Sequence, residues 1–404
     1  MIPTAPSTDS LWLDTATQAN CPSLLADIEA DVVIIGGGLA GVSFAWHLLE
    51  GGLNPERLVL LESRNIASRA SGRNAGFLLA DFAEPYGRLK EAMGDGAARL
   101  RHLSLRNQEW LKATAAQLEI NWQWSPDGVL VAAASAHEEE EYRASVQALT
   151  DDGFPVDFLA ADALSERLAS PNAFGGMFDP AGGGCHPACF VLELAKACMK
   201  RGARFFEQSE VIHLDSESVV AQTARGSVRA ARLVLAINAY APLLDDTLAS
   251  LIAPTRGQML SFPPVADRVL KPVVYRNHGF EYFRQDMSGR FVFGGFRQTA
   301  EALEVGYEET PTSDVQAGLC DFARQLYPQL QALEPEYRWA GTMGFSVDGM
   351  PFVGPHPHKD GILLCLGFTG HGFGLASECA KVGAALLLEG SHPDAELFSP
   401  RRLL

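Results

Sequence analysis

A glycine cluster near the N-terminus has the spacing of a phosphate-binding turn. The segment DVVIIGGGLAGVSFAWHLLEGG contains Gly36, Gly38 and Gly41, which fit the pattern G-x-G-x-x-G. In this pattern the first glycine permits a tight turn, the second lets the backbone approach a pyrophosphate, and the third lets a helix pack against a strand. We therefore expect a helix N-terminus that contacts phosphates, with Leu39 and Ala40 beside them.

A carboxylate follows at the distance that this pattern requires. The apolar run Leu58–Leu61 predicts a second strand, and it leads into Glu62 about 20 residues after the last glycine. Glutamate there can accept hydrogen bonds from both ribose hydroxyls of an adenosine and repels a 2′-phosphate. The unit predicts a dinucleotide site, including Ser63 and Arg64, that disfavours NADP and admits NAD or FAD. The alternative is a tight strand–helix turn without a ligand.

Two other segments bear on the choice between NAD and FAD. The first, ASRASGRNAGFL at residues 67–78, is too rich in Ser, Gly and Asn to continue as a helix. It could reach further along a cofactor that the first glycines hold, or it could be a surface loop. The residues of this segment that we assign to the cofactor site are Ser71, Gly72, Arg73, Asn74, Ala75 and Gly76.

The second segment, GILLCLGFTGHGFGLASECAKVGAALLLEG, starts at Gly361. It predicts a strand at Ile362–Leu366, a glycine turn, and a helix from about Gly372 to Leu388. The N-terminus of such a helix stabilises an anion. A reduced flavin carries negative charge, which such a helix N-terminus would stabilise. A simple NAD dehydrogenase has no obvious need for a second anion-stabilising helix end. The alternative is one more packed α/β unit without a ligand.

Length, charge and cysteine content restrict the class of protein. The chain has 404 residues, too many for one core, so two domains are favoured. A net charge of −17 argues against a nucleic-acid partner, and seven cysteines without paired short spacing suggest reduced thiols. We see no signal peptide and no apolar run of the ~20 residues that a membrane span needs. We therefore expect a cytoplasmic protein without an integral membrane segment.

The remaining periodicity predicts a mixed fold. The expected elements of the first part are an extended arm over residues 1–27, a helix over 97–119, a strand at Val129–Ala133 and a helix over Ala188–Lys200. They are followed by one strand near 203–215, further strands at Ser218–Thr223, Ser227–Ala230 and Arg232–Ile237, and antiparallel sheet at 256–263, 273–284 and 290–297. The run HEEEEY at His137–Tyr142 predicts a solvated helix face. No cluster predicts a metal site.

Several motifs that follow one another in order resemble a single family. They are the glycine turn, Glu62, the SGRNAG loop, the GGCHP turn at Gly183–Pro187, WAGTMGFSVDGMPFVGP at 339–355, and GFTGHGFG at 367–374. Together they are similar to the D-amino acid oxidase-type (DAO) family of FAD-dependent oxidoreductases. The SLWLDTA segment at Ser10 and the SGRNAG loop are most similar to the γ-glutamylputrescine oxidoreductase branch.

The resemblance implies a fold of mixed α/β and α+β class. A Rossmann-like FAD-binding domain would comprise residues 28–84, 170–246 and 339–392. It would be interleaved with an antiparallel-sheet substrate domain of residues 85–169 and 247–338. The further cofactor positions that the resemblance implies are Val211, Ala236, Asn238, Gly341, Gly344, Gly367, Thr369, Gly370, His371 and Gly372.

The resemblance also implies how the cofactor is held and what it does. FAD is expected to be non-covalent, because sarcosine oxidases attach it through a cysteine near the position of Gly341, and no cysteine lies between Cys320 and Cys365. The expected reaction oxidises a C–N bond of a small amine, with hydride transfer to flavin N5 and hydrolysis of the imine. Oxygen or another acceptor would take the electrons, and the oligomeric state stays open.

Three positions depart from the family pattern. Met343 stands where glycine and D-amino acid oxidases carry an arginine for the substrate carboxylate. Removing one partner of such a buried pair costs about 3–5 kcal/mol. Gly374 and Val292 stand where sarcosine oxidases carry lysines, the second of which assists reaction with oxygen. The methionine favours an amine substrate whose carboxylate is remote from the reacting carbon or absent. The missing lysine favours a dehydrogenase, which passes its electrons to an acceptor other than oxygen.

The candidates for the substrate pocket are Tyr275, His278, Glu281, Tyr282, Arg297, Met343 and His371. A simple α-amino acid would require Arg297, Arg284 or Arg256 to reach into the site. Cys185 is expected to be a packed thiol, and Asp348 to order a turn. The alternative functions are a D-amino acid or glycine oxidase-like enzyme with a relocated carboxylate anchor, an FAD-dependent enzyme that modifies a tRNA base, and a non-catalytic flavin module.

Overall fold

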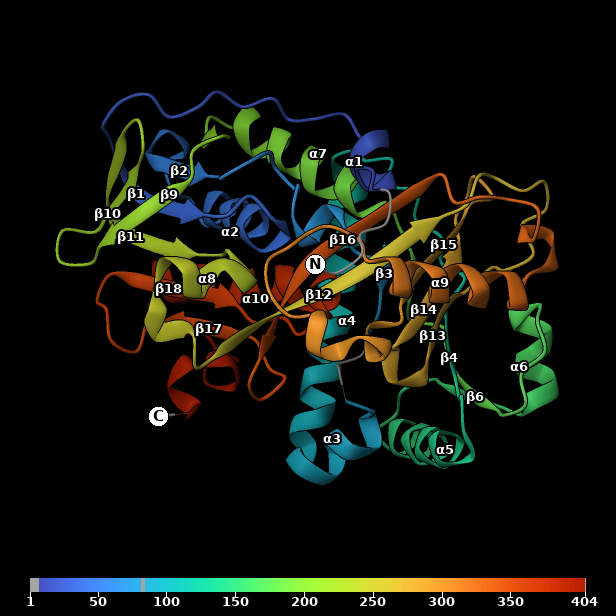
Figure 1. The fold of residues 1–404 in the computed structure, drawn as a ribbon. Helices are drawn as coiled ribbons and strands as arrows, with labels where there is room; N and C mark the ends of the chain where they lie inside the picture. The colour runs from blue at the N-terminus through green and yellow to red at the C-terminus, as the bar shows by residue number, and fades with distance from the viewer. Residues whose placement is uncertain (1–6, 81–83, 404) are drawn as a thin grey trace.

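The computed structural model describes residues 7–80 and 84–403, in which two eight-stranded sheets stand side by side (Figure 1). The first sheet has the strand order β17-β18-β11-β1-β2-β8, and β10 and β9 continue from β11. Its strands are β1 (Ile28–Ile35), β2 (Leu58–Leu61), β8 (Arg204–Phe206), β9 (Val211–Asp215), β10 (Val220–Thr223), β11 (Ser227–Leu235), β17 (Phe352–Pro355) and β18 (Ile362–Leu366).

The central strands of the first sheet are apolar because both of their faces are covered. Val32 and Ile34 of β1 belong to the hydrophobic cluster formed with helices α2 (Leu39–Glu50), α7 (Pro187–Lys200) and α10 (Gly372–Leu388). Val33 and Ile35 point the other way, into the cluster that includes β10 and helix α8 (Ala241–Leu244). Strands β2 and β11 pair with β1 in parallel, and β18 pairs in parallel with β11. This is the arrangement of a buried parallel sheet.

The second sheet is largely antiparallel and has the order β16-β12-β15-β14-β13-β4-β6-β5. Its strands are β4 (Val129–Ala132), β5 (Asp157–Leu159), β6 (Gly176–Asp179), β12 (Ile252–Ser261), β13 (Val273–Arg276), β14 (Glu281–Gln285), β15 (Phe291–Gly295) and β16 (Tyr337–Ser346). A small pair, β3 (Phe77–Leu78) and β7 (Gly183–Gly184), lies apart from both sheets. The other helices are α1 (Leu11–Thr15), α3 (Tyr86–Met93), α4 (Asp95–Gln117), α5 (Ala136–Asp151), α6 (Ala161–Leu168) and α9 (Ser313–Leu326).

The two halves of the chain are interleaved, as the fold class requires. Strands β6 and β16 lie in ranges that we assigned to the FAD-binding domain, and both pair within the second sheet. β16 pairs with β12 along its whole length, from Tyr337 to Ser346. Helix α4 packs against α10, where the Ser104 hydroxyl donates to the carbonyl of Gly374 at 2.8 Å. A Cβ at Gly374 would lie 2.5 Å from the Leu79 carbonyl oxygen, so glycine is the residue that this close approach admits.

Several predicted strands were wrong in extent. The range 203–215 holds two strands, β8 and β9, which join different partners. The two strands expected at Ser227–Ala230 and Arg232–Ile237 are one strand, β11. The pattern at 273–284 is broken by a turn at Asn277–Gly279, where three consecutive residues have positive φ. An Asn-His-Gly turn inside an alternating pattern is a signal that periodicity alone does not detect.

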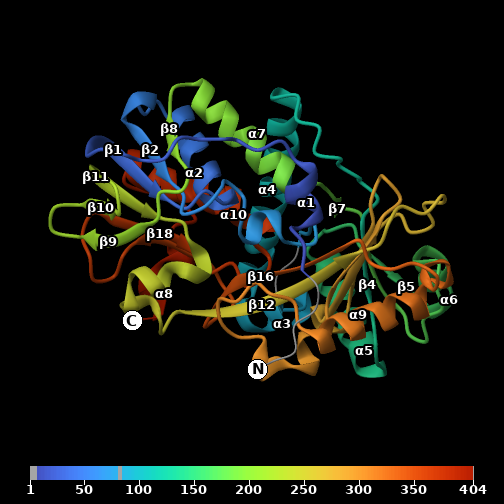
Figure 2. The same cartoon turned by 45° about the horizontal axis from the view of Figure 1, so that its top comes forward.

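The N-terminal arm is packed rather than draped over the surface. Residues 11–15 form the short helix α1, and Trp12 is 1% exposed. Figure 2 shows α1 beside α7, with the chain running from there along the edge of the molecule to β1. The Trp12 indole nitrogen donates to the carbonyl of Asn74 at 2.7 Å. The arm therefore supports the SGRNAG loop, which the sequence pattern did not indicate.

The HEEEEY run is only partly solvated. Ser135 is the N-cap of α5 and its hydroxyl accepts from the Glu138 amide at 3.2 Å, while the Glu138 carboxylate accepts from the Ala134 amide at 3.3 Å. The spacing is that of a capping box, although the glutamate here bonds the amide of the residue before the N-cap, and this bond keeps Glu138 turned inward. Tyr142 is buried as well, whereas His137 and Glu140 are exposed.

Two further features can be stated for the described ranges. No group of three His, Cys, Asp or Glu side chains is placed there to hold a metal ion. Within the same ranges, none of the helices is long and apolar enough to cross a membrane.

Lowering the pH from about 6.5 toward 4 should destabilise the fold through two buried histidines. Burial lowers the pKa of His47 and of His186 to about 4. In this window the unfolded chain binds protons that the folded chain does not, so the free energy of unfolding falls by up to about 1.4 kcal/mol per pH unit for each group. His47→Gln should flatten the fall in melting temperature between these pH values, and His137→Gln on the surface should not. Equal pH slopes in H47Q and the unaltered chain would contradict this assignment.

Candidate active site

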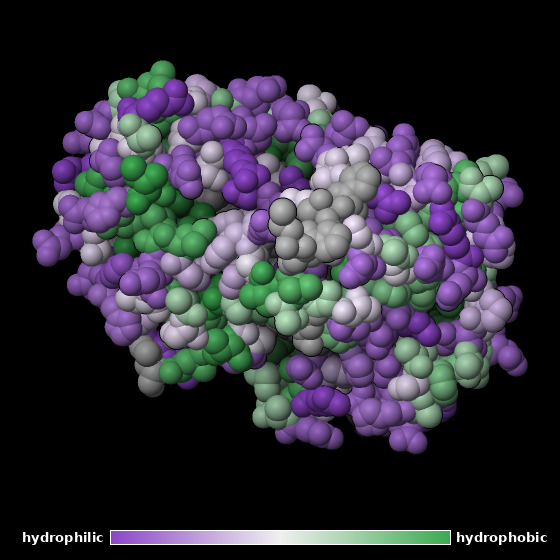
Figure 3. All heavy atoms as spheres, viewed as in Figure 1, coloured by the Kyte–Doolittle hydropathy of each residue, from purple (hydrophilic) through white to green (hydrophobic). Residues whose placement is uncertain are grey.

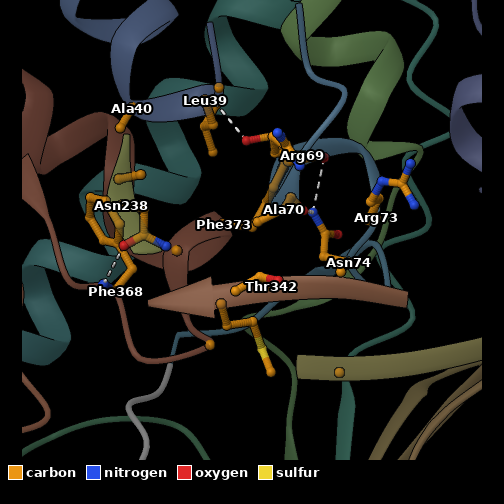
Figure 4. A pocket seen from close by; sticks show the side chains of 18 of the residues that line it. Leu39, Ala40, Arg69, Ala70, Arg73, Asn74, Asn238, Thr342, Phe368 and Phe373 are labelled. Atoms are coloured by element: carbon orange, nitrogen blue, oxygen red, sulfur yellow. Dashed lines mark hydrogen bonds between the residues drawn. The ribbon is translucent and has the colours of Figure 1, made fainter. Parts of the chain in front are cut away.

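One large cavity of about 580 Å³ lies between the two sheets and collects the segments singled out above. It is lined by the end of β1 and the start of α2, the 69–77 segment, the ends of β9 and β11, strands β12 to β14 and β16, and the turn before α10. Figure 4 shows residues of the start of α2, the 69–77 segment, the end of β11, β16 and the turn before α10 around the cavity. At one end, hydrophobic side chains gather over β9 and α8 (Figure 3), where Ile212 and Leu243 line the cavity and are 59% and 66% exposed.

The glycine turn has the close contacts that its pattern implies. Gly36 has a φ of 111°, and a Cβ there would lie 2.5 Å from the carbonyl oxygen of Ala236. A Cβ at Gly41 would lie 2.0 Å from the Gly36 carbonyl oxygen, so this glycine serves the packing of helix on strand. Gly38 begins α2 and faces the cavity. The Ser71 hydroxyl accepts from the Leu39 amide at 2.8 Å and joins the turn to the SGRNAG loop (Figure 4).

Glu62 is held firmly at the end of β2. Its carboxylate accepts from the amides of Gly37 and Arg64, each at 2.8 Å, and from the Ser63 hydroxyl at 3.0 Å. A carboxylate offers about four acceptor positions, so it can still accept from a ligand in the cavity that it lines. Its neighbour Arg64 points away and pairs with Glu309 at 2.8 Å.

Two helix N-termini open onto the cavity without a side-chain cap. The N-cap residues are Gly38 of α2 and His371 of α10, and neither has a side chain that accepts a hydrogen bond from its helix, although Ser71 accepts from the Leu39 amide. Ser10, Ser135 and His186 cap α1, α5 and α7 through their side chains, whereas α3, α4, α6 and α9 lack a side-chain cap as well, so what sets α2 and α10 apart is that they open onto the cavity. The first amides of a helix need partners from outside it, and an anionic group is a favoured one. The cavity therefore suits a ligand with negative charge at two separate places.

The SGRNAG loop is braced from several sides. Asn74 donates to the carbonyls of Ala70 and Ser71 at 3.0 Å and accepts from the Gly76 amide at 2.8 Å. Arg73 donates to the carbonyl of Ala340 on β16 at 2.9 Å. These bonds give the loop one conformation against β16, so its inner face is preorganised.

The turn before α10 is fastened to the end of β11. The Asn238 side chain accepts from the Gly367 amide at 2.8 Å and from the Phe368 amide at 3.4 Å (Figure 4). The Thr369 hydroxyl lies 3.0 Å from that of Ser346, and the Thr369 amide donates to the Gly344 carbonyl at 2.9 Å. The helix end is thereby held at a defined place between the two sheets.

The structure brings most of the predicted cofactor positions to the cavity wall. Those that line it are Gly36, Gly38, Leu39, Ala40, Glu62, Ser63, Ser71, Arg73, Asn74, Ala75, Val211, Ala236, Asn238, Gly341, Thr369, Gly370, His371 and Gly372. Those that lie behind it are Gly41, Arg64, Gly72, Gly76, Gly344 and Gly367. Glycines in the second group face other parts of the chain at short range; a Cβ at Gly72, for example, would lie 2.4 Å from the Ala67 carbonyl oxygen.

Seven side chains form what we call the substrate end of the cavity. They are Tyr275, His278, Tyr282, Arg297, Met343, Phe345 and His371. Tyr275 and Tyr282 are register partners on β13 and β14, so both point to the same face. Burial raises the pKa of Tyr282 to about 12, which keeps its phenol neutral. The Tyr275 and His371 rings meet edge to face at 6.0 Å.

Three candidates for this end lie outside it. Glu281 points away from the cavity because it precedes Tyr282 on a strand, and it pairs with Arg276. Arg256 pairs with Glu304 at 2.8 Å. Arg284 donates to the carbonyls of Gly76 and Cys185, each at 2.7 Å.

Other features of the chain also fall outside the cavity wall. Val292 is fully buried in the protein interior, away from the cavity. Cys185 is buried as well, and this burial raises the pKa of its thiol to about 12. The Asp348 carboxylate accepts from the Met350 amide and so orders a turn. Sequence reasoning missed Arg69, Tyr240 and Phe345, which line the cavity. Phe345 was detectable, because it follows Met343 by two residues on a strand and must share its face.

Removing the Glu62 carboxylate should weaken retention of an adenosine dinucleotide. Hydrogen bonds to a charged group contribute about 1.5–3 kcal/mol, so Glu62→Gln should raise the dissociation constant for FAD by roughly 10- to 100-fold. The recovery of flavin fluorescence on dilution measures the release. Glu56→Gln, in the same unit but exposed and outside the cavity, is the matched control. Equal retention in E62Q and E56Q would refute the role of this carboxylate.

Comparison with known proteins identifies the family. The FAD dependent oxidoreductase (DAO) family model matches residues 31–386. The γ-glutamylputrescine oxidoreductase of Escherichia coli K12 is 26% identical over 391 residues, which cover 93% of this chain and 87% of that protein. Glycine oxidase of Bacillus licheniformis is 25% identical over 369 residues, with 89% and 93% covered.

Solved structures share the fold. L-proline dehydrogenase from P. horikoshii has a TM-score of 0.79 at 20% identity, covering 93% of this chain and 98% of that chain. Glycine oxidase from Geobacillus kaustophilus has a TM-score of 0.78 at 22% identity, covering 93% and 99%. The glycine turn, the fixed glutamate and the two uncapped helix ends fit the cofactor that this family uses. The chain belongs to the DAO family of FAD-dependent oxidoreductases.

Proposed function

We propose that this enzyme oxidises a C–N bond of a small amine. The observation that carries the proposal is the substrate end of the cavity, an aromatic and thioether-lined space beside the N-terminus of α10. FAD bound there would supply the hydride-accepting chemistry, and its reduced form would carry negative charge. The α10 N-terminus, with about half a positive charge, is suited to stabilise that negative charge.

The substrate end also favours an uncharged nitrogen. In the described residues no carboxylate lines it, and Arg297 contributes a positive charge. Both burial and a nearby positive charge lower the pKa of an amine, so the bound substrate loses its ammonium proton more readily than in water. A neutral amine has the free electron pair that hydride loss from the adjacent carbon requires. We infer that Tyr275 and Tyr282, which line this end, orient that amine.

A glycine oxidase-like enzyme with a relocated carboxylate anchor is the second candidate. Arg297 favours it, because this guanidinium lines the cavity while Arg256 and Arg284 are engaged elsewhere. The two candidates differ in where the substrate carries its carboxylate.

Anaerobic mixing of the FAD-loaded enzyme with a panel of amines tests the proposal. Amines that differ only in the presence of an α-carboxylate should be compared. We expect loss of the oxidised flavin absorbance with amines that lack the α-carboxylate, and a slow response or none with glycine and alanine. Bleaching by α-amino acids alone would favour the second candidate. Absence of bleaching by every amine would refute both.

Exchange of Met343 should alter specificity in a directed way. Met343→Arg places a cation at the cavity wall, where it can pair with an α-carboxylate. Removing one partner of a buried ion pair costs about 3–5 kcal/mol, so supplying the missing partner should recover part of that free energy. We therefore expect kcat/KM for glycine or D-alanine to be at least tenfold higher in M343R than in the control Met343→Leu. Steady-state kinetics measure the change. If M343R and M343L have the same low activity with α-amino acids, Met343 does not determine the choice.

A further inference from the structure

The guanidinium of Arg297 differs from those of Arg69 and Arg73, which also line the cavity, in having no polar partner among the described side chains. Arg69 pairs with Glu309 at 2.8 Å, and Arg73 donates to the carbonyls of Ser68 and Ala340. The Arg297 carbonyl accepts from the Ala300 amide at 3.0 Å, but no hydrogen bond or ion pair joins its guanidinium to any side chain that the structure describes. A guanidinium in a concave site has five N–H donors to satisfy, and a carboxylate matches two of them at once.

Aromatic rings hold this guanidinium in place without occupying its donors. The Arg297 guanidinium carbon lies 4.5 Å from the centre of the Phe280 ring and 5.3 Å from that of Phe345. Contacts with ring faces orient a planar cation and leave its edge open to a planar anion. The side chain is therefore preorganised for an acidic group.

The backbone before Arg297 is strained in a way that directs the side chain. Gly295 has a φ of 116°, and Phe296 adopts a left-handed conformation with a φ of 61°. A bulky residue in this region costs free energy and persists only where its surroundings impose it. The Phe296 ring packs at 5.3 Å against that of Phe322 on α9. The turn after β15 is thus fixed so that Arg297 faces the cavity.

The position of Arg297 defines how far an acidic group would lie from the amine. Gly341, Met343 and Phe345 follow one another on the same face of β16. Gly341 adjoins Arg73 of the SGRNAG loop, and Phe345 adjoins Arg297. Two residues along a strand span about 7 Å. An acid at Arg297 would therefore lie about one such step further from the SGRNAG loop than a group held beside Met343, a separation that suits a carboxylate several bonds from the amine.

We propose that Arg297 binds a carboxylate that the amine substrate carries several bonds away from the oxidised C–N bond. The inference rests on the proposed amine oxidation and narrows it to one substrate class, amino acids with a distant carboxylate. A diamine is disfavoured, because its second ammonium would face Arg297 and no described carboxylate lines the substrate end.

Kinetics with length-matched amines test the proposal. The probes are 5-aminopentanoate, pentylamine and 1,5-diaminopentane, each as the primary and the N-methyl amine. Arg297→Gln should raise KM for 5-aminopentanoate by roughly 10- to 100-fold and leave KM for pentylamine within about threefold. Arg297→Lys should restore part of the affinity, because it keeps the charge and loses the planar fork. Arg290→Gln is the matched control, since it removes one charge at the other end of β15 and pairs outside the cavity.

Binding of pentanoate separates this inference from the proposed reaction. Calorimetry of the FAD-loaded enzyme should show that the unaltered chain and R290Q bind pentanoate with similar affinity. R297Q should bind pentanoate at least tenfold more weakly. Pentanol, which lacks the carboxylate, should bind to none of the three proteins at the same concentration. This result supports the role of Arg297 even if no amine is oxidised, an outcome that would refute only the proposed reaction. Equal KM changes for 5-aminopentanoate and pentylamine in R297Q, a preference for the diamine, or no loss of pentanoate binding in R297Q would overturn it.

Discussion

The parallel packing of α2 and α10 is the constraint on which the site depends. Ser43 and Ser377 meet with their hydroxyls 2.9 Å apart, and Gly383 fits against Phe44 further along the same pair of helices. Both positive helix ends therefore face one cavity, and neither has a side-chain cap. Such ends repel one another unless negative charge lies between them. Strands β1, β11 and β18, adjacent in the first sheet, hold the helices in this arrangement, so fold and cofactor are electrostatically coupled.

The parts of the molecule built from contiguous segments were predictable from sequence. The strand–glycine–helix unit at β1 and α2 and the helix α10, with its start at Gly372, follow from local patterns, and the structure confirms them. The division of 203–215 into two strands does not follow from local patterns, because their partners are distant in sequence. The same applies to Arg297, whose direction depends on a left-handed phenylalanine packed against α9. Local periodicity carries no information about such contacts.

The distribution of charge in the cavity is uneven although the chain as a whole is acidic. Glu62 and Glu210 lie toward the glycine turn and β9, and arginines line the middle and the substrate end. Arg69 is balanced by Glu309, which also holds Arg64. The other charged groups of the wall are Arg73 and Arg297 against Glu62 and Glu210, so the two signs are separated along the cavity, within a protein of net charge −17. The part that holds Arg297 attracts anionic groups locally. Selection by charge therefore takes place inside the cavity.

The packing of α1 has a consequence for how the enzyme matures. The Thr8 amide donates to the carbonyl of Arg338 at 2.8 Å, and Trp12 holds the carbonyl of Asn74, which lies in the SGRNAG loop. During synthesis this N-terminal segment is made long before residue 338. Its hydrogen bond to the Arg338 carbonyl therefore forms only after most of the chain has been synthesised. The loop that this segment supports also donates through Arg73 to the carbonyl of Ala340, so its contacts are complete only once β16 has been made. Flavin capture is thereby tied to a late event, and a partly made chain has no finished pocket in which to trap the cofactor.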